Sequence, residues 1–216
     1  MAFTIKKLGH IAYDKALNIQ QQTFLEVSNG KQDCLIFCEH PHVFTLGKSA
    51  NKNNLLIDQD ILDTIQATSY QIDRGGDITY HGPGQLVCYP IINLRKIKIG
   101  VKKYVQIIEQ GIINTLDDYG IKAYQIDNLT GIWVGKEPEI PRKIGAIGIR
   151  IKQGISMHGF ALNIHTDLDY FRHINPCGIT DKKVTSMIHE NVHCTIDEFS
   201  DLFLSHFEKS WSRETL

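Results

Sequence analysis

Residues 144–164, IGAIGIRIKQGISMHGFALNI, contain two apolar runs separated by Lys152, Gln153 and Gly154. Apolar runs rich in β-branched residues are typical of strands, and a short connection that contains glycine is typical of a hairpin. The stretch therefore predicts two neighbouring antiparallel strands, over residues 144–151 and 155–164. We expect the fold to be a sheet built outward from this hairpin.

Strand-like runs and helical patterns alternate along the rest of the chain. We expect strands over residues 34–37, 69–73, 86–91, 122–126 and 131–135. Apolar residues at helical spacing predict a helix over residues 101–119, which ends at Gly120. A second helix is expected over residues 13–28, and a third begins at Thr195, whose Glu198 completes a capping box. The predicted fold class is α/β of the α+β type, with a mixed sheet and packed helices.

Length and charge limit the class of protein. The 216 residues carry a formal net charge of −1, and no linker or shift in composition divides them. We therefore expect a single domain over residues 1–216 and no general attraction to nucleic acid. The first residues lack the features of a signal or transit peptide, and no apolar run approaches the length of a membrane span. These features predict a cytoplasmic protein that does not enter a membrane.

The stretch RGGDITYHGPGQ, residues 74–85, combines glycines and hydrogen-bonding side chains more densely than any other part of the chain. Glycine allows left-handed backbone angles and a close approach to a ligand. The polar side chains are those of Arg74, Asp77, Thr79, Tyr80 and His81. The spacing matches neither a P-loop nor a dinucleotide fingerprint. The stretch indicates a binding site of another kind.

The chain has five cysteines, and an odd number favours free thiols in a reducing compartment. Cys34 and Cys88 lie in apolar strand patterns, where a thiol behaves as a small hydrophobic group. Cys194 has no activating neighbour in the sequence. Cys177 lies in NPCGI, residues 175–179, a turn suited to presenting a side chain. A Pro-Cys-Gly turn alone is weak evidence for a catalytic nucleophile, because short motifs have high false-positive rates.

Cysteines and histidines also lie close together at Cys34, Cys38, His40 and His42. If this segment is a strand, the Cα atoms of the two cysteines lie about 13 Å apart, too far to share a tetrahedral zinc ion. We therefore expect no metal site here.

A nucleophilic cysteine needs a base or a cation within hydrogen-bond reach. His81, His158 and Lys143 are candidates, because the histidines lie in glycine-flanked polar segments and the lysine opens a predicted strand. Each of the three also has an ordinary structural interpretation. Spacing in the sequence leaves the choice between them open.

Five motifs carry a resemblance to a known family: RGGDITYHGPGQLVCYP, GIWVG, KIGAIGIRI, HGFALN and NPCGI. Their order and approximate spacing resemble those of the lipoyl(octanoyl) transferases, the LipB family. The likeness extends from near His40 to Thr185. One departure is Gly145, where the family often has alanine, and a smaller residue there is expected to leave the site open. The resemblance implies the fold of biotin and lipoate protein ligases.

The resemblance also implies an activity. Members of the family move an octanoyl or lipoyl group from the thioester of acyl carrier protein to a lysine of lipoyl domains. The implied acceptors are the lipoyl domains of 2-oxoacid dehydrogenases and the H protein of glycine cleavage. No metal and no dissociable cofactor is implied.

Site roles follow from the same resemblance. Cys177 matches the nucleophile, and Lys143 matches the lysine that lowers the pKa of that cysteine and moves protons. The implied substrate-binding residues are Arg74, Gly75, Gly76, Asp77, Ile78, Thr79, Tyr80, His81, Ala146, Ile147, Gly148, Gly159, Phe160 and Ala161. Small side chains among them make room for an acyl chain, and backbone amides could stabilise an oxyanion.

Two other enzyme classes are alternatives. An ATP-dependent lipoate protein ligase shares the implied fold, but it activates its acid as an adenylate and does not use a protein thiol. A cysteine thioesterase would use the thiol, but it would admit water to the thioester. Cys177 argues against the ligase, and the joint presence of Cys177 and Lys143 argues against a binding module without catalysis.

Overall fold

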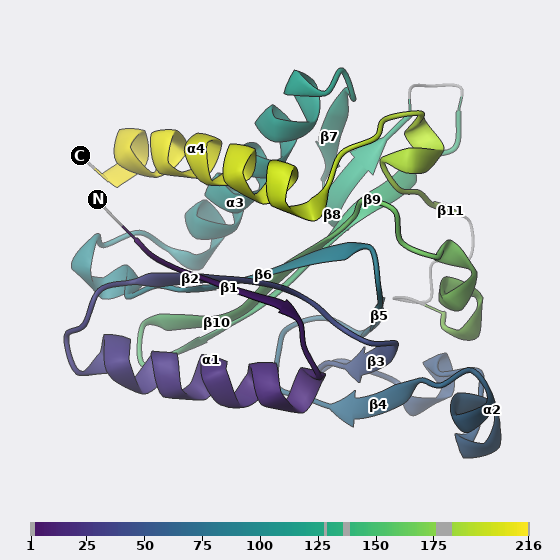
Figure 1. The fold of residues 1–216 in the computed structure, drawn as a ribbon. Coiled ribbons are helices and arrows are strands. Elements are labelled where there is room, and N and C mark those ends of the chain that lie inside the picture. The colour runs from purple at the N-terminus through teal and green to yellow at the C-terminus, as the bar shows by residue number, and fades with distance from the viewer. Residues whose placement is uncertain (1–2, 128, 136–138, 176–182, 216) are drawn as a thin grey trace.

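The hairpin predicted from the sequence lies inside a large sheet. The computed structural model describes residues 3–127, 129–135, 139–175 and 183–215, and these form two sheets and several helices (Figure 1). The order in the large sheet is β1 (Thr4–His10), β2 (Cys34–Glu39), β6 (Gln85–Ile91), β10 (Ile155–Asn163), β9 (Arg142–Lys152), β8 (Leu129–Val134) and β7 (Ala123–Ile126). A short strand, β11 (Lys183–Val184), pairs with β9.

The large sheet is mixed, as predicted. β1 runs parallel to β2 and β11 runs parallel to β9, whereas the other neighbours in this sheet are antiparallel. In the β9–β10 hairpin, Ile155 lies opposite Lys152 and Leu162 lies opposite Gly145. The hairpin and all five of the further strands expected from the sequence are confirmed.

Helices cover both faces of the large sheet (Figure 1). α3 (Val101–Asp118) and α4 (Ile196–Thr215) pack on one face around Phe203 and Phe160, and α1 (Tyr13–Ser28) packs on the other. The three predicted helices are therefore confirmed. The capping box is present: Glu198 N–H donates to Thr195 Oγ1 over 3.1 Å, and Thr195 N–H donates to Glu198 Oε2 over 2.7 Å. No helix within the described ranges combines the length and apolar character needed to cross a bilayer.

A second, smaller sheet was not expected from the sequence. It has the order β4 (Thr68–Gln71), β3 (Val43–Leu46) and β5 (Ile78–His81), and α2 (Gln59–Thr64) packs against it. Short 3₁₀ turns cover Lys52–Asn54, Leu94–Lys96, Leu168–His173 and Ile188–Glu190. The loop between β4 and β5 contains the start of the glycine-rich stretch. The small sheet therefore carries this stretch toward the large sheet.

Candidate active site

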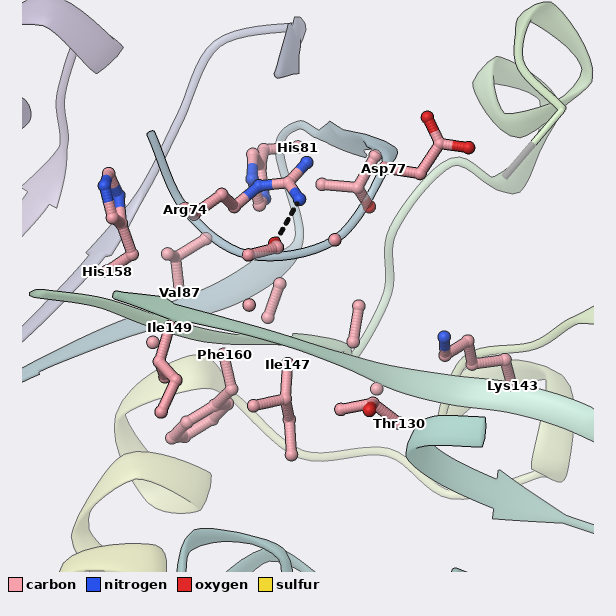
Figure 2. A pocket seen from close by; sticks show the side chains of 18 of the residues that line it. Arg74, Asp77, His81, Val87, Thr130, Lys143, Ile147, Ile149, His158 and Phe160 are labelled. Carbon is pink, nitrogen blue, oxygen red and sulfur yellow. Dashed lines mark hydrogen bonds between the residues drawn. The ribbon is translucent and has the colours of Figure 1, made fainter. Parts of the chain in front are cut away.

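A cavity of about 590 Å³ lies between the loop after β4 and the hairpin β9–β10. This volume is within the range of small-molecule sites. Its lining side chains project from both faces of the hairpin, with His158 toward one end and Lys143 toward the other (Figure 2). The glycine-rich stretch and the hairpin, which are distant in the sequence, thus form one enclosure.

Most residues that the sequence assigned to the site line this cavity. They are Arg74, Gly75, Gly76, Asp77, Ile78, Thr79, His81, Lys143, Ala146, Ile147, Gly148, Gly159, Phe160 and Ala161. Tyr80 does not line it: its hydroxyl lies 2.7 Å from Nδ1 of His42, and its ring stacks on Tyr170 in the core of the small sheet. Cys177, the predicted nucleophile, lies outside the described residues.

Small residues form the floor of the cavity. In the hairpin register Gly148 lies opposite Gly159, and Ala146 lies opposite Ala161. A Cβ atom on Gly148 would lie 3.0 Å from Cδ of Arg74, so the loop passes close over this floor. The departure noted above, Gly145, also lines the cavity, with its Cβ position 3.3 Å from a methyl group of Leu162.

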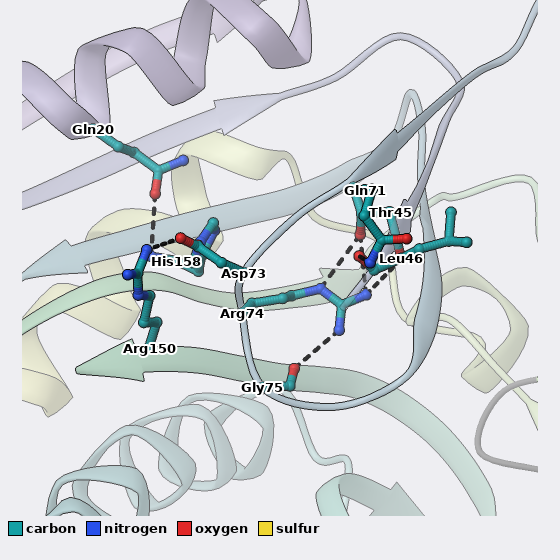
Figure 3. A network of polar contacts seen from close by, with 9 residues as sticks. All are labelled: Gln20, Thr45, Leu46, Gln71, Asp73, Arg74, Gly75, Arg150 and His158. Carbon is teal, nitrogen blue, oxygen red and sulfur yellow. Dashed lines mark hydrogen bonds and ion pairs between the residues drawn. The ribbon is translucent and has the colours of Figure 1, made fainter. Parts of the chain in front are cut away.

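Arg74 fixes the glycine-rich loop to the small sheet (Figure 3). Its guanidinium donates to the carbonyl oxygen of Thr45 over 2.7 Å, to Thr45 Oγ1 over 3.1 Å and to the carbonyl of Gly75 over 3.0 Å. Gly75 N–H donates to the carbonyl of Ile149 on β9 over 2.9 Å. The two bonds to Thr45 are buried, and together with the bond to Ile149 they hold the loop against both sheets.

His81 and His158 are buried in the wall of the cavity and lack the properties of a general base. Nδ1 of His81 lies 2.7 Å from Oε1 of Gln85, and burial lowers the pKa of His81 to about 3. Nε2 of His158 lies 2.9 Å from Oδ1 of Asp73, and burial lowers the pKa of His158 to about 4. Both rings are neutral and hydrogen-bonded near pH 7. Lys143 is the remaining candidate of the three.

Three buried histidines predict a loss of stability in mild acid. Burial lowers the pKa of His40 and His158 to about 4 and that of His81 to about 3, against an ordinary value of 6.5. Below about pH 6.5, protonation therefore favours the unfolded chain, by about 1.4 kcal/mol per pH unit for each ring. The contribution of the three neutral rings to the free energy of unfolding is complete above pH 6.5, and it is lost as the pH falls toward 4. We expect Tm, followed by circular dichroism, to fall steeply across this window.

Two variants separate the histidine contribution from that of other groups. His158 has a φ of +56°, which asparagine also tolerates, so His158→Asn removes a titrating ring without new backbone strain. This variant is expected to flatten the dependence of Tm on pH. His193→Gln, at an exposed position, is the matched control for replacing a histidine with an amide side chain. A Tm that does not change between pH 6.5 and pH 4 would contradict the prediction.

Lys143 extends across the backbone of Gly131 on β8. Its Nζ lies 5.1 Å from the centre of the Trp133 ring, a distance suited to a cation–π contact. Gly131 has a φ of +133°, and a Cβ atom there would overlap Cε of Lys143 and lie 3.0 Å from Nζ. The carbonyl of Lys143 accepts a hydrogen bond from the N–H of Thr185 over 2.9 Å. Neighbouring strands therefore fix both the backbone and the side chain of Lys143.

The other four cysteines have the environment of structural thiols. Cys34, Cys38 and Cys88 are buried and Cys194 is partly buried, and all four are free. Burial raises the pKa of each of these thiols, to about 11 for Cys34. The cluster around Cys38 is accounted for by hydrogen bonds: His40 donates from Nδ1 to the carbonyl of Ile11 over 2.8 Å and accepts at Nε2 from Tyr89.

Several lining residues were not assigned to the site from the sequence. Polar members of this group are Gln85, Thr130 and Asn163, and Trp133 and Val184 lie beside Lys143. A signal existed for two of them, because Gln85 ends the glycine-rich stretch and Asn163 ends the motif HGFALN. Alternation along a strand could not show that these side chains turn toward the cavity.

Solved structures share the fold. An archaeal bipartite lipoate protein ligase from Thermoplasma acidophilum superposes with a TM-score of 0.78 at 17% sequence identity, over 98% of this chain and 84% of that chain. Biotin protein ligase from Aquifex aeolicus superposes with a TM-score of 0.54 at 10% identity, over 99% of this chain and 70% of that chain. The predicted ligase-like fold is confirmed.

Sequence comparison identifies the family. Residues 12–208 match the lipoyl protein ligase A/B catalytic domain. The octanoyltransferase of Bacteroides fragilis is 48% identical over 189 residues, which are 85% of this chain and 86% of that protein. The octanoyltransferase of Solibacter usitatus is 47% identical over 213 residues, 98% of this chain and 94% of that protein. As its motifs predicted, the chain belongs to the octanoyltransferases of the lipoyl protein ligase A/B catalytic-domain family.

Proposed function

We propose that this octanoyltransferase takes its acyl group from octanoyl-acyl carrier protein, holds it as a thioester on Cys177, and passes it to a lysine of lipoyl domains. The acceptors would be the lipoyl domains of 2-oxoacid dehydrogenases and the H protein of glycine cleavage. The observation that carries this proposal is the position of Lys143 at the end of a cavity with a floor of small residues. Such a cavity accommodates an acyl chain and leaves its carbonyl group beside the lysine.

In the first step, the thiolate of Cys177 attacks the carbonyl carbon of the octanoyl thioester. The bond between that carbon and the sulfur of the carrier breaks, and the ammonium of Lys143 gives its proton to the departing thiolate. The products are the free carrier thiol, an octanoyl thioester on Cys177 and a neutral Lys143. An ammonium beside the thiol favours the reactive thiolate at the start.

In the second step, the amine of the acceptor lysine attacks the thioester on Cys177. An amide bond forms, the bond to the sulfur of Cys177 breaks, and neutral Lys143 takes the proton of the amine. Cys177 returns to the thiolate and Lys143 to the ammonium, so the two residues are restored without another reactant.

The cavity walls supply the substrate contacts of this proposal. The acyl chain would lie over the floor of Ala146, Gly148, Gly159 and Ala161, with an apolar contact to Ile78. Ile147 and Phe160 would support this floor from the opposite face of the hairpin, where they pack in the core. The loop Arg74–Asp77, with Thr79 and His81, would close the cavity from the other side. Tyr80 would contribute through the packing of the small sheet, because its side chain faces that core.

Intact mass spectrometry tests the proposal. The protein is mixed with octanoyl-acyl carrier protein in the absence of ATP, and Cys177→Ser is treated in the same way. We expect one octanoyl adduct on the wild type, removed by hydroxylamine, and no hydroxylamine-sensitive adduct on the variant. Acylation of a lipoyl domain only when octanoate and ATP are supplied would instead assign a ligase. Release of free octanoate faster than amide formation would assign a thioesterase.

A further inference from the structure

A line of hydrogen-bonded, buried polar side chains runs along the wall of the cavity, from the glycine-rich loop to the strand of Lys143. Its members are Arg74, Thr45, His81, Gln85, Asn163 and Thr185, each with at most 8% of its surface exposed. Gln85 and Asn163 are cross-strand partners on β6 and β10, and their side chains line the cavity. In this setting an unmatched donor or acceptor is costly, so each bond constrains the next.

From His81 to Thr185, each side chain in this line donates a hydrogen bond to the next residue. Gln85 Nε2 donates to the carbonyl of Tyr80 over 3.2 Å, so its Oε1 faces His81 and accepts from Nδ1–H over 2.7 Å. Gln85 Nε2 also donates to Oδ1 of Asn163 over 2.9 Å. The amide nitrogen of Asn163 is thereby directed to the carbonyl of Thr185, to which it donates over 2.9 Å. Turning either amide around would bring two acceptors together.

The line ends at Lys143 and its neighbour. Thr185 N–H donates to the carbonyl of Lys143 over 2.9 Å, and Thr185 Oγ1 donates to Glu190 over 2.7 Å. Glu190 also accepts from Nε and Nη2 of Arg142, over 3.0 and 2.9 Å. Thr185 therefore makes two hydrogen bonds near Lys143. One is to the backbone of Lys143, and the other is to the carboxylate of Glu190, which also binds Arg142. Asn163 fixes Thr185 from the cavity side.

We propose that Asn163, supported by Gln85, is a positioning residue for octanoyl transfer, which holds Thr185 and through it sets the place of Lys143 relative to the acyl group. This inference rests on the proposed role of Lys143. A purely structural role would lower the stability of the protein without changing turnover in the folded enzyme. The two roles therefore differ in kcat, measured at a temperature at which every variant is folded.

Asn163→Asp is the sharpest test, because it keeps size and shape but replaces the donor to Thr185 with an acceptor. The resulting repulsion displaces Thr185 and with it the backbone of Lys143. We expect kcat for transfer from octanoyl-acyl carrier protein to a lipoyl domain to fall about a hundredfold, with KM for the carrier little changed. The smaller change Glu190→Gln, at the partly exposed end of the line, is expected to lower kcat about tenfold by the same route.

Two controls are available in the chain. Ser156→Ala, at the opposite end of β10, removes a buried bond to the carbonyl of Pro90, so it should lower Tm while kcat stays at the wild-type value. Asn114→Asp makes the same chemical change on the exposed face of α3, next to Gln110, and should alter neither quantity. Ser156→Ala separates loss of stability from loss of position, Asn114→Asp controls for the amide-to-carboxylate change at an exposed site, and Glu190→Gln tests position without adding a charge to the cavity.

The outcomes are distinct. Wild-type kcat in folded Asn163→Asp would overturn the inference, and a rise in KM with unchanged kcat would do the same. If Asn163→Asp does not fold, wild-type kcat in Glu190→Gln would overturn it. Absence of an octanoyl thioester on wild-type Cys177 would instead refute the proposed function. That result comes from the mass measurement on the wild-type protein, which uses none of these variants.

Discussion

Replacement of Lys143 with methionine is expected to slow octanoyl transfer by about a thousandfold, the range lost when a positioned proton-transfer group is removed. Methionine has a similar length, so the main loss is the ammonium group, together with its cation–π contact to Trp133. In the proposed mechanism, this loss removes the cation that favours the thiolate of Cys177 and the base that deprotonates the acceptor amine. Both half-reactions should slow in rapid-quench measurements of thioester formation and of amide formation.

Lys143→Arg separates the two proposed roles of Lys143, stabilising the thiolate and deprotonating the acceptor amine. Arginine keeps a positive charge near the thiol but does not give up its proton near neutral pH. We therefore expect it to form the octanoyl thioester faster than Lys143→Met, while amide formation stays as slow as in that variant. A rate within tenfold of the wild type for Lys143→Met in both half-reactions would exclude Lys143 as the proton-transfer group.

Gly131→Ala is expected to reduce kcat about a hundredfold, although the change adds a single methyl group outside the proposed acyl site. The methyl group would overlap Cε of Lys143, and a φ of +133° is unfavourable for any residue with a Cβ atom. The lysine side chain or strand β8 must therefore move. Steady-state kinetics with octanoyl-acyl carrier protein and a lipoyl domain measure the effect.

Gly120→Ala is the matched control. Gly120 also has a left-handed φ, of +79°, but a Cβ atom there would meet nothing within 4 Å. Strain alone should cost about 1 kcal/mol and lower Tm, with no change in kcat. An equal loss of kcat in both variants would show that backbone strain, and not the overlap with Lys143, limits turnover.

The elements predicted correctly are those with strong local patterns. The strands near the hairpin are apolar and continuous, and α3 shows a clear helical period that ends at Gly120. β1 was missed because it is a partly exposed edge strand with two consecutive lysines, and its pairing with β2 spans a helix. β3 and β5 are only four residues long. Their pairing depends on contacts that no local pattern contains.

The same limit applies to the site. Most of the residues that the motif resemblance assigned to the site line the cavity, because the motifs form part of its walls. It could not distinguish Tyr80 from His81, which are neighbours on β5 and so point to opposite sides of the small sheet. Nor could it pair Gln85 with Asn163, since that contact requires the register of β6 against β10. Resemblance gives the positions, and the fold gives their orientation.

The hairpin β9–β10 carries both Lys143 and the small residues of the cavity floor within one uninterrupted segment of the chain. The predicted nucleophile, Cys177, belongs to a different segment that follows the hairpin in the sequence. The cavity floor and the predicted nucleophile therefore come from separate segments of the chain, so a change at Cys177 leaves the residues of the floor in place.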